Sequence, residues 1–295
     1  MKTVTLRSPA KINLCLSVLG KRPDGYHEVE MLMQMVGLYD EVSVALGGSN
    51  IKVQCDNEAV PADERNIAWK AAAKILDASG MKGGLSIEIR KKIPVAAGLA
   101  GGSGNAAAVL VAANKLLATK YKANQLADIG KLIGMDVPFF FYGPTAAAKG
   151  RGEIVKPLPA IPSCWVLLVN PRFETSTKWV YNNLNLRLTK KVDCTKISRL
   201  TVRNIAKELH NDLEAVTAAA HPEINKIKEA LSAQKALGVR MSGSGPTVFG
   251  IFETEAACLA AENNLSGEGW WLFPAQTLTA SPFAEHLEGV TVPLV

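Results

Sequence analysis

One glycine-rich stretch decides the fold: Pro94-Val95-Ala96-Ala97-Gly98-Leu99-Ala100-Gly101-Gly102-Ser103-Gly104-Asn105-Ala106-Ala107-Ala108. Small residues let the backbone approach a ligand closely, and glycines can turn successive N–H groups toward one point. The alanine-rich run that follows, from about Asn105 to Ala118, predicts a helix. The first N–H groups of a helix are unpaired and its dipole favours negative charge. The stretch therefore predicts a triphosphate site, with Ser103 as a further hydroxyl contact or a magnesium ligand.

The glycine stretch fits neither of the two best-known nucleotide motifs. It is not a Walker A loop, because no Gly-Lys-Ser/Thr ends it, and it is not a Rossmann fingerprint, because no acidic residue lies at the right distance. A flexible turn with an N-cap is the simpler alternative. Five of the seven residues from Gly98 to Gly104 are glycine or serine, which favours phosphate binding over a plain turn.

The length and the charge of the chain set the broad class. Its 295 residues suffice for one large domain or two mid-sized ones, with a sizeable buried core. The formal charge of +6 comes from 33 Lys and Arg against 27 Asp and Glu. The densest basic spots, Arg90-Lys91-Lys92 and Lys190-Lys191, lack the length and the aromatic residues of a nucleic-acid strip, so no nucleic-acid partner is expected. A solvated basic surface and the attraction of a polyanionic ligand both remain open.

Cysteine spacing and hydropathy predict the compartment. Five cysteines are scattered without a Cys-x-x-Cys pair, and four histidines lie too far apart for a metal site. We expect free thiols in a reducing cytosol, with neither a disulfide frame nor a zinc site. The N-terminus has no apolar signal-peptide stretch, and no run of about 18 apolar residues exists, so we expect a cytoplasmic protein without a membrane span.

Periodicity predicts helices and strands mixed in both halves of the chain. In the first half we expect a strand that breaks at Pro9 and restarts, and a segment at 28–36 that is helical or extended. Strands are also expected at 40–45, 51–54 and 85–90, and helices at 66–77 and 123–133.

Proline and glycine become dense between Gly143 and Pro162, which predicts a domain boundary. We place it after residue 158, so that the domains are 1–158 and 159–295. The second domain is predicted to hold strands at 163–169, within 239–252 and at 270–273, and helices at 177–183, 202–220, 222–231 and 255–263.

A lysine and an aspartate stand out as a candidate acid–base pair. On a strand, Lys11 and Asn13 share one face, while Ala10, Ile12 and Leu14 share the other. Asp136 precedes Val137, Pro138 and three phenylalanines, which predicts partial desolvation of its carboxylate. Such a pair can take a proton from an alcohol, with Asp136 as base and Lys11 as its electrostatic partner. The alternatives are a solvated lysine and an aspartate that caps a turn.

Separated segments resemble one family of enzymes. Pro9-Ala10-Lys11-Ile12-Asn13-Leu14 with Asp24-Gly25-Tyr26-His27 resembles the start of the 4-diphosphocytidyl-2-C-methyl-D-erythritol kinases. The glycine stretch is similar to the ATP-binding motif of the wider GHMP kinase superfamily, and Arg240-Met241-Ser242-Gly243-Ser244-Gly245-Pro246-Thr247-Val248-Phe249 to its third motif. The segments at 134–140 and 211–214 are also similar to this family. The match spans about residues 5–255.

The resemblance implies a fold and a reaction. The fold would be the two-domain α+β GHMP kinase fold, with an N-terminal domain like the second domain of ribosomal protein S5 and a ferredoxin-like C-terminal domain. The enzyme would be a small-molecule kinase that transfers the γ-phosphoryl of ATP, with Mg²⁺, to the 2-hydroxyl of a cytidine-diphosphate-linked methylerythritol. This is a step of the non-mevalonate (MEP) route to isoprenoid and terpenoid precursors. The protein would act as a monomer or a homodimer.

The resemblance also implies roles for individual residues. Asp136 would be the base and Lys11 its partner. The ATP-binding residues would be Asn66 and Lys91 near the adenine, with Pro94, Val95, Ala96, Ala97, Gly98, Leu99, Ala100, Gly101, Gly102, Ser103 and Gly104 at the phosphates. The acceptor site would comprise Tyr26 and His27 at the cytosine, Asn13 near the diphosphate, and Thr177, Tyr181, Gly243 and Ser244.

Two positions depart from the family, which usually has a serine where this chain has Gly104 and a small residue in place of Met135. The first departure bears on the metal contact. Three alternative functions stay open: another GHMP kinase such as homoserine or mevalonate kinase, an inactive sensor of the same fold, and a plain nucleotide-binding module. Tyr26 and His27 argue against the first, and Lys11 with Asp136 against the second. The many acceptor-side matches argue against the third.

Overall fold

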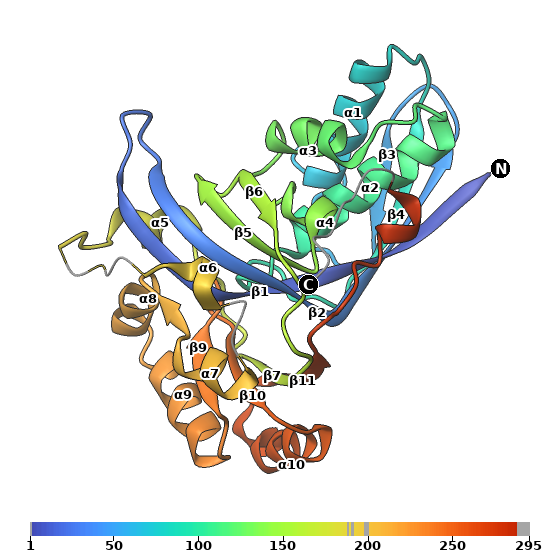
Figure 1. Cartoon of the computed structure of the whole chain (residues 1–295). Helices are drawn as coiled ribbons and strands as arrows, with labels where there is room; N and C mark the ends of the chain where they lie inside the picture. The colour runs from blue at the N-terminus through green and yellow to red at the C-terminus, as the bar shows by residue number, and fades with distance from the viewer. Residues whose placement is uncertain (1, 188, 190–191, 198–200, 288–295) are drawn as a thin grey trace.

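The computed structural model describes residues 2–187, 189, 192–197 and 201–287, which form two β-sheets with helices packed on them (Figure 1). Within this part of the chain the first sheet has seven strands, in the order β3-β4-β2-β1-β8, with β5 paired to β2 and β6 to β5. Their bounds are β1 (Thr3–Lys21), β2 (His27–Leu46), β3 (Lys52–Cys55), β4 (Leu85–Arg90), β5 (Thr145–Gly150), β6 (Ile154–Pro157) and β8 (His210–Asn211).

The long antiparallel hairpin of β1 and β2 is the spine of the first sheet. It runs from the Lys21–His27 pair near its turn to the Thr3–Ala45 pair at the far end. The break predicted at Pro9 is wrong: β1 continues through it, and the pairing only shifts register between Pro9 and Ala10. Proline has no N–H to donate to a ladder, so a local irregularity absorbs it. The segment at 28–36, left open above, is extended and belongs to β2.

Helices α1 (Ile67–Ser79), α2 (Gly101–Leu117), α3 (Ala123–Lys131) and α4 (Phe139–Tyr142) cover the first sheet. Helix α2 is buried along most of its length and contacts both α1 and β1. It begins at Gly101, four residues earlier than the alanine content predicted. Tertiary packing overrides the low helix propensity of glycine here, so the end of the glycine stretch becomes the first turn of a helix.

The second sheet has the strand order β11-β7-β10-β9, from β7 (Trp165–Asn170), β9 (Gly238–Met241), β10 (Val248–Phe252) and β11 (Trp271–Gln276). All of its pairings are antiparallel. Helices α9 (Glu223–Ala233) and α10 (Glu255–Leu265) pack on it. This order, with one helix before β9 and one after β10, is the ferredoxin-like arrangement that the resemblance implied.

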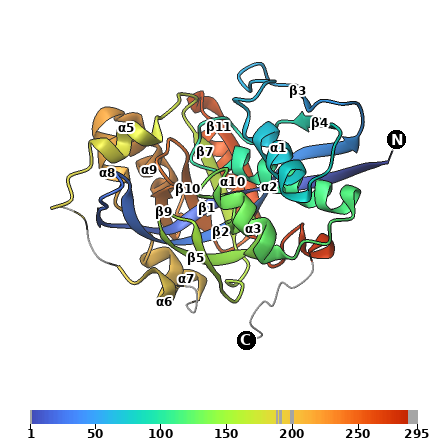
Figure 2. The ribbon, with the colours of Figure 1, turned by 90° about the horizontal axis from the view of Figure 1, so that it is seen from above.

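The two sheets share a core. Ala10, Ile12 and Leu14 of β1 pack in one buried cluster with Leu168 and Phe249 of the second sheet. The opposite face of β1, which carries Lys11 and Asn13, is thereby turned away from this core. Figure 2 shows α5 (Thr177–Asn182) and α8 (Glu214–Ala220) at the end of the molecule that holds the turn of the β1–β2 hairpin, and β3 and β4 toward the opposite end.

The single helix predicted at 202–220 is wrong. The structure has α7 (Val202–Lys207) and α8, separated by β8, which pairs in parallel with Cys15 and Leu16 of β1. Asn211 interrupts the helical pattern because its side-chain amide donates to the carbonyls of Met241 (2.7 Å) and Gly243 (2.8 Å). Because β8 joins the first sheet, the second half of the chain does not lie wholly apart from the first. The division proposed after residue 158 falls in the connection between β6 and β7.

The expectation of five free thiols is also wrong. Cys15 of β1 and Cys194 of α6 (Cys194–Ile197) form a disulfide, with Cα atoms 5.5 Å apart. The two residues are 179 positions apart, so their spacing in the sequence held no sign of the pairing. Cys55, Cys164 and Cys258 are free thiols. Among the described residues, no helix is both long enough and apolar enough to cross a bilayer.

Candidate active site

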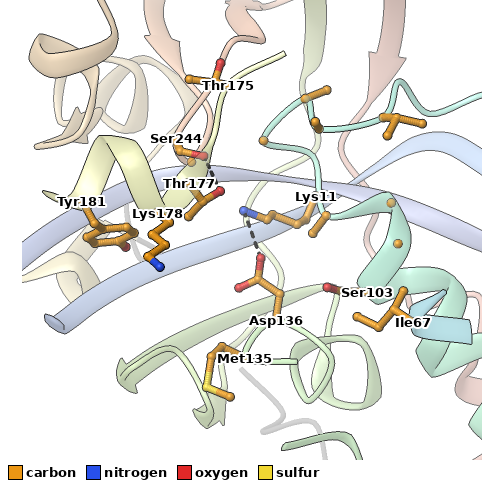
Figure 3. Close-up of a pocket in the computed structure, with 18 of the residues that line it drawn as sticks. Lys11, Ile67, Ser103, Met135, Asp136, Thr175, Thr177, Lys178, Tyr181 and Ser244 are labelled. Atoms are coloured by element: carbon orange, nitrogen blue, oxygen red, sulfur yellow. Dashed lines mark hydrogen bonds and ion pairs between the residues drawn. The ribbon is translucent and has the colours of Figure 1, made fainter. Parts of the chain in front are cut away.

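A cleft of about 1020 Å³ gathers most of the predicted site residues. Its walls come from β1, the glycine stretch, the turn before α4, α5 and the loop after β9 (Figure 3). Twenty predicted residues line it: Lys11, Asn13, Tyr26, His27, Asn66, Lys91, Pro94, Val95, Ala96, Ala97, Gly98, Ala100, Gly101, Gly102, Ser103, Asp136, Thr177, Tyr181, Gly243 and Ser244. Leu99 and Gly104 are not among the lining residues.

The glycine stretch forms a tight loop that leads into α2. Ala96, Gly98 and Ala100 have φ values of 51°, 74° and 52°, so left-handed residues alternate with ordinary ones. Successive N–H groups in such a pattern turn toward a common point. Helix α2 has no side-chain cap, which leaves its first N–H groups for an anion.

Gly104 faces strand β1. A Cβ atom at this position would lie 2.6 Å from Ser8 Oγ and 3.0 Å from the carbonyl oxygen of Pro9. A side chain here would therefore start against β1, whereas Ser103 lines the cleft. The departure from the family at position 104 thus concerns the packing of α2 on β1.

Lys11 and Asp136 meet on the floor of the cleft. Lys11 Nζ lies 3.7 Å from Asp136 Oδ2 and donates to Asn13 Oδ1 at 2.6 Å (Figure 3). The lysine side chain is 4% exposed and the aspartate 31%. The backbone N–H of Lys11 also donates to the carbonyl of Leu99 at 3.0 Å, which ties the pair to the glycine stretch. An ion pair with an open carboxylate therefore lies next to a candidate phosphate site.

Aromatic residues gather at the far end of the cleft. The rings of His27 and Tyr181 stack with centroids 5.1 Å apart, and Tyr26, which precedes His27 in the sequence and also lines the cleft, is 52% exposed. Burial, helped by the charge of Lys21, lowers the pKa of His27, so its ring is neutral at pH 7. Burial first, and then the charge of Asp136, raises the pKa of Tyr181 well above its usual value. This end can accept a flat, uncharged ring.

The two residues predicted at the adenine are engaged within the protein. The Asn66 side chain caps α1: its oxygen accepts from the N–H of Ala68 at 2.8 Å, and its nitrogen donates to the carbonyl of Pro61 at 2.7 Å. Lys91 pairs with Asp40. Both residues line the cleft, but their polar groups bond protein partners. An adenine at this end would therefore contact their apolar surfaces.

Several supporting residues were not predicted. Asp40 is fully buried and accepts from the N–H groups of Lys92 (2.8 Å) and Ile93 (2.9 Å) as well as pairing with Lys91. It follows Tyr39 on an ordinary-looking strand, so no sequence signal marked it.

Ser242 belongs to the third motif that was recognised, but its contacts were not predicted. Its hydroxyl donates to the carbonyl of Gly98 at 2.9 Å and accepts from the N–H of Asn13 at 3.2 Å. It thereby joins the third motif to the glycine stretch and β1.

The part of the chain that the structure describes contains no cluster of three or more His, Cys, Asp or Glu residues that could hold a metal ion. Ser103 lines the cleft at the start of α2, and its hydroxyl is an oxygen donor of the kind that can bind Mg²⁺.

Two family models match the chain. The model described as GHMP kinases N terminal domain matches residues 66–144, and the one described as GHMP kinases C terminal matches residues 194–269.

Similar proteins include two bacterial enzymes named 4-diphosphocytidyl-2-C-methyl-D-erythritol kinase. The one from Pelobacter propionicus is 48% identical over 282 residues, and the one from Geobacter sulfurreducens is 46% identical over 281 residues. Each alignment covers 94% of this chain and 100% of the relative.

Solved structures of two kinases are also similar to this chain. A crystal structure of 4-(cytidine 5'-diphospho)-2C-methyl-D-erythritol kinase has a TM-score of 0.82 at 32% identity, covering 93% of this chain and 99% of that one. A homoserine kinase from Cytophaga hutchinsonii has a TM-score of 0.74 at 20% identity, covering 95% and 96%, and shows a shared fold.

Proposed function

This chain belongs to the GHMP kinases and, within them, to the 4-diphosphocytidyl-2-C-methyl-D-erythritol kinases, and from that premise we propose how its cleft carries out the reaction. The donor is ATP. The acceptor is 4-diphosphocytidyl-2-C-methyl-D-erythritol, whose 2-hydroxyl receives the γ-phosphoryl group in the non-mevalonate route to isoprenoid precursors.

The observation that carries the mechanism is the Lys11–Asp136 ion pair beside the glycine stretch. We assign the base to Asp136, whose open carboxylate accepts the proton of the 2-hydroxyl as that oxygen attacks phosphorus. Lys11 holds the carboxylate in place and offers its charge to the oxygens that become negative. The hydrogen bond from Lys11 Nζ to Asn13 Oδ1 fixes the ammonium group between the Asp136 carboxylate and those oxygens.

The donor side acts by position and charge. The N–H groups at the start of α2 and in the preceding loop hold the polyphosphate, and phosphoryl transfer needs such positioning and neutralisation more than covalent help. The phosphates and Ser103 would hold Mg²⁺, which supplies charge neutralisation of the polyphosphate when bound.

The acceptor's cytosine is assigned to the aromatic end of the cleft, between Tyr26 and the stacked pair of His27 and Tyr181. A neutral imidazole can both donate and accept a hydrogen bond, which suits the polar edge of a pyrimidine. Both substrates are nucleotides, and we propose that the enzyme meets them in the cytoplasm.

A coupled assay of ADP release tests this function. Purified protein with MgATP is offered the cytidine-linked methylerythritol, free methylerythritol, homoserine and mevalonate in parallel. We expect ADP formation with the first alcohol alone, and much slower formation with Asp136→Asn. Faster turnover with homoserine or mevalonate would reject the assignment, and no turnover with any alcohol would favour an inactive sensor.

A further inference from the structure

We propose that Lys178 is a specificity-determining residue that binds the diphosphate of the acceptor. This inference rests on the function proposed above and adds to it a residue that neither the motifs nor the family resemblance singled out. The Lys178 side chain lines the cleft and is seen in Figure 3.

The charges of the cleft are the first argument. Five Lys or Arg residues line it, and four of them have a carboxylate partner. The pairs are Lys11–Asp136 (3.7 Å), Arg65–Asp63 (2.7 Å), Arg151–Glu153 (3.3 Å) and Lys91–Asp40. The Lys178 side chain makes no ion pair or hydrogen bond with the residues that the structure describes. Among these five lining cations, the Lys178 ammonium group is therefore the one whose charge is available to a ligand.

The position of Lys178 is the second argument. Helix α5 carries Thr177, Lys178 and Tyr181 along the cleft. In Figure 3 the Lys178 side chain lies between Tyr181, which stacks on His27, and the Lys11–Asp136 pair. The acceptor's diphosphate lies between its cytidine and its polyol. With the cytosine ring at Tyr181 and the reacting 2-hydroxyl at Asp136, the diphosphate that joins them would pass Lys178.

The physical consequence is selection by charge. An ammonium group next to a diphosphate gives a charge-assisted hydrogen bond, which is stronger than a neutral one. The same polyol without its diphosphate would gain nothing from Lys178. The residue would therefore raise the affinity for nucleotide-linked alcohols and leave the cytosine contact unaffected.

Binding of two fragments tests the role of Lys178. The dissociation constants of cytidine and of CDP are measured by calorimetry for the wild type and for Lys178→Met. We expect the variant to bind CDP roughly tenfold more weakly, as for loss of a charge-assisted hydrogen bond, and to bind cytidine as the wild type does. Lys178→Arg should restore most of the CDP affinity.

The matched control is Lys74→Met, which removes the same charge from an exposed position on α1 outside the cleft. It should change neither constant. The inference is overturned if Lys178→Met weakens cytidine and CDP by the same factor, or weakens neither. Loss of CDP affinity that is equally large in Lys74→Met would likewise overturn it, because the effect would then belong to net charge.

Failure of the inference can be told apart from failure of the proposed function. If wild-type protein binds neither fragment and does not phosphorylate the cytidine-linked acceptor, the function itself is rejected. If the wild type turns the acceptor over but Lys178→Met keeps its CDP affinity, only the role of Lys178 is rejected.

Discussion

At the scale of single residues, Asp136 reaches the cleft from the turn before α4, and Lys11 reaches it from the middle of β1. Lys11 is almost fully buried, with both Asn13 and Asp136 as partners. Asp136 keeps nearly a third of its side chain exposed. This asymmetry suits a fixed cation and a carboxylate that a substrate can still reach.

Asp136→Asn should lower turnover about 10²- to 10⁴-fold, the usual contribution of a general base, because an amide cannot accept the proton. ATP binding should survive, since the glycine stretch is unchanged. Single-turnover kinetics and ATP calorimetry check both parts. Asp128→Asn, at an exposed surface pair with Lys131, is the matched control. Turnover within threefold of the wild type in Asp136→Asn would remove Asp136 as the base.

His27→Ala should weaken the cytidine-linked acceptor far more than ATP, because the ring lies at the aromatic end of the cleft on Tyr181. Steady-state KM values for both substrates measure this. His286→Ala removes a histidine outside the cleft and should leave both values unchanged. Equal weakening of ATP and acceptor by His27→Ala would displace the cytosine from this end.

The pH dependence of His27 follows from its lowered pKa, which burial causes first and Lys21 second. The folded protein favours the neutral ring, so the stabilising contribution is present above the unfolded pKa of about 6.5 and is lost as pH falls through the folded pKa. Proton NMR of the ligand-free protein, assigned with His27→Gln, should show His27 titrating below 6.5. A midpoint at or above 6.5 would contradict the proposed neutral ring.

At the scale of elements, the contact between the glycine stretch and the third motif is set by Gly98. Its φ is +74°, and a Cβ atom there would lie 2.2 Å from the carbonyl oxygen of Ser242. Ala96 and Ala100 adopt similar φ values, so the clash, more than backbone strain, should decide the effect of a substitution.

Gly98→Ala should therefore lower the free energy of unfolding by about 1–3 kcal/mol more than Gly48→Ala does, which is the range for an overpacked contact. Gly48 is the matched control, because its φ is +67° with nothing within 4 Å of a Cβ atom. The KM for ATP should rise in Gly98→Ala alone. Urea unfolding and kinetics measure the two effects. Equal unfolding free energies for the two variants would show that the loops do not touch as described.

Elements with a clear period were predictable, and their interruptions were not. The strand at Leu85–Arg90 and the helix after Asn66 follow directly from alternation and helical spacing. The break between α7 and α8 depends on Asn211, whose amide bonds the distant carbonyls of Met241 and Gly243. Periodicity describes neighbours along the chain, so it could not reveal this tertiary contact.

At the scale of the whole molecule, the site joins segments from both halves of the chain. Motif resemblance identified Lys11, Asp136 and the glycine stretch as site residues. It gave no distances, so the buried partner Asp40 emerged only from the fold, as did Lys178, whose side chain has no ion-pair partner among the residues that the structure describes. The Cys15–Cys194 disulfide was missed for the same reason, because spacing in sequence does not report proximity in space.

The disulfide should make the stability of the molecule sensitive to reductant. Because it closes a long loop, reduction should lower the unfolding free energy by about 2–4 kcal/mol. Urea unfolding with and without reductant measures this, and Cys194→Ala should abolish the difference. Cys258→Ala, a buried free thiol, should retain it. Thiol titration of unreduced, unfolded protein should find three thiols, and a count of five would contradict the disulfide.

The most direct test of the account is a crystal structure of the protein with the cytidine-linked methylerythritol and a non-hydrolysable ATP analogue. We predict the acceptor's 2-hydroxyl within hydrogen-bond distance of the Asp136 carboxylate, about 2.6–3.2 Å, and in line with the γ-phosphorus held by the glycine stretch. An acceptor bound with its 2-hydroxyl out of reach of Asp136, or a triphosphate held away from the start of α2, would contradict it.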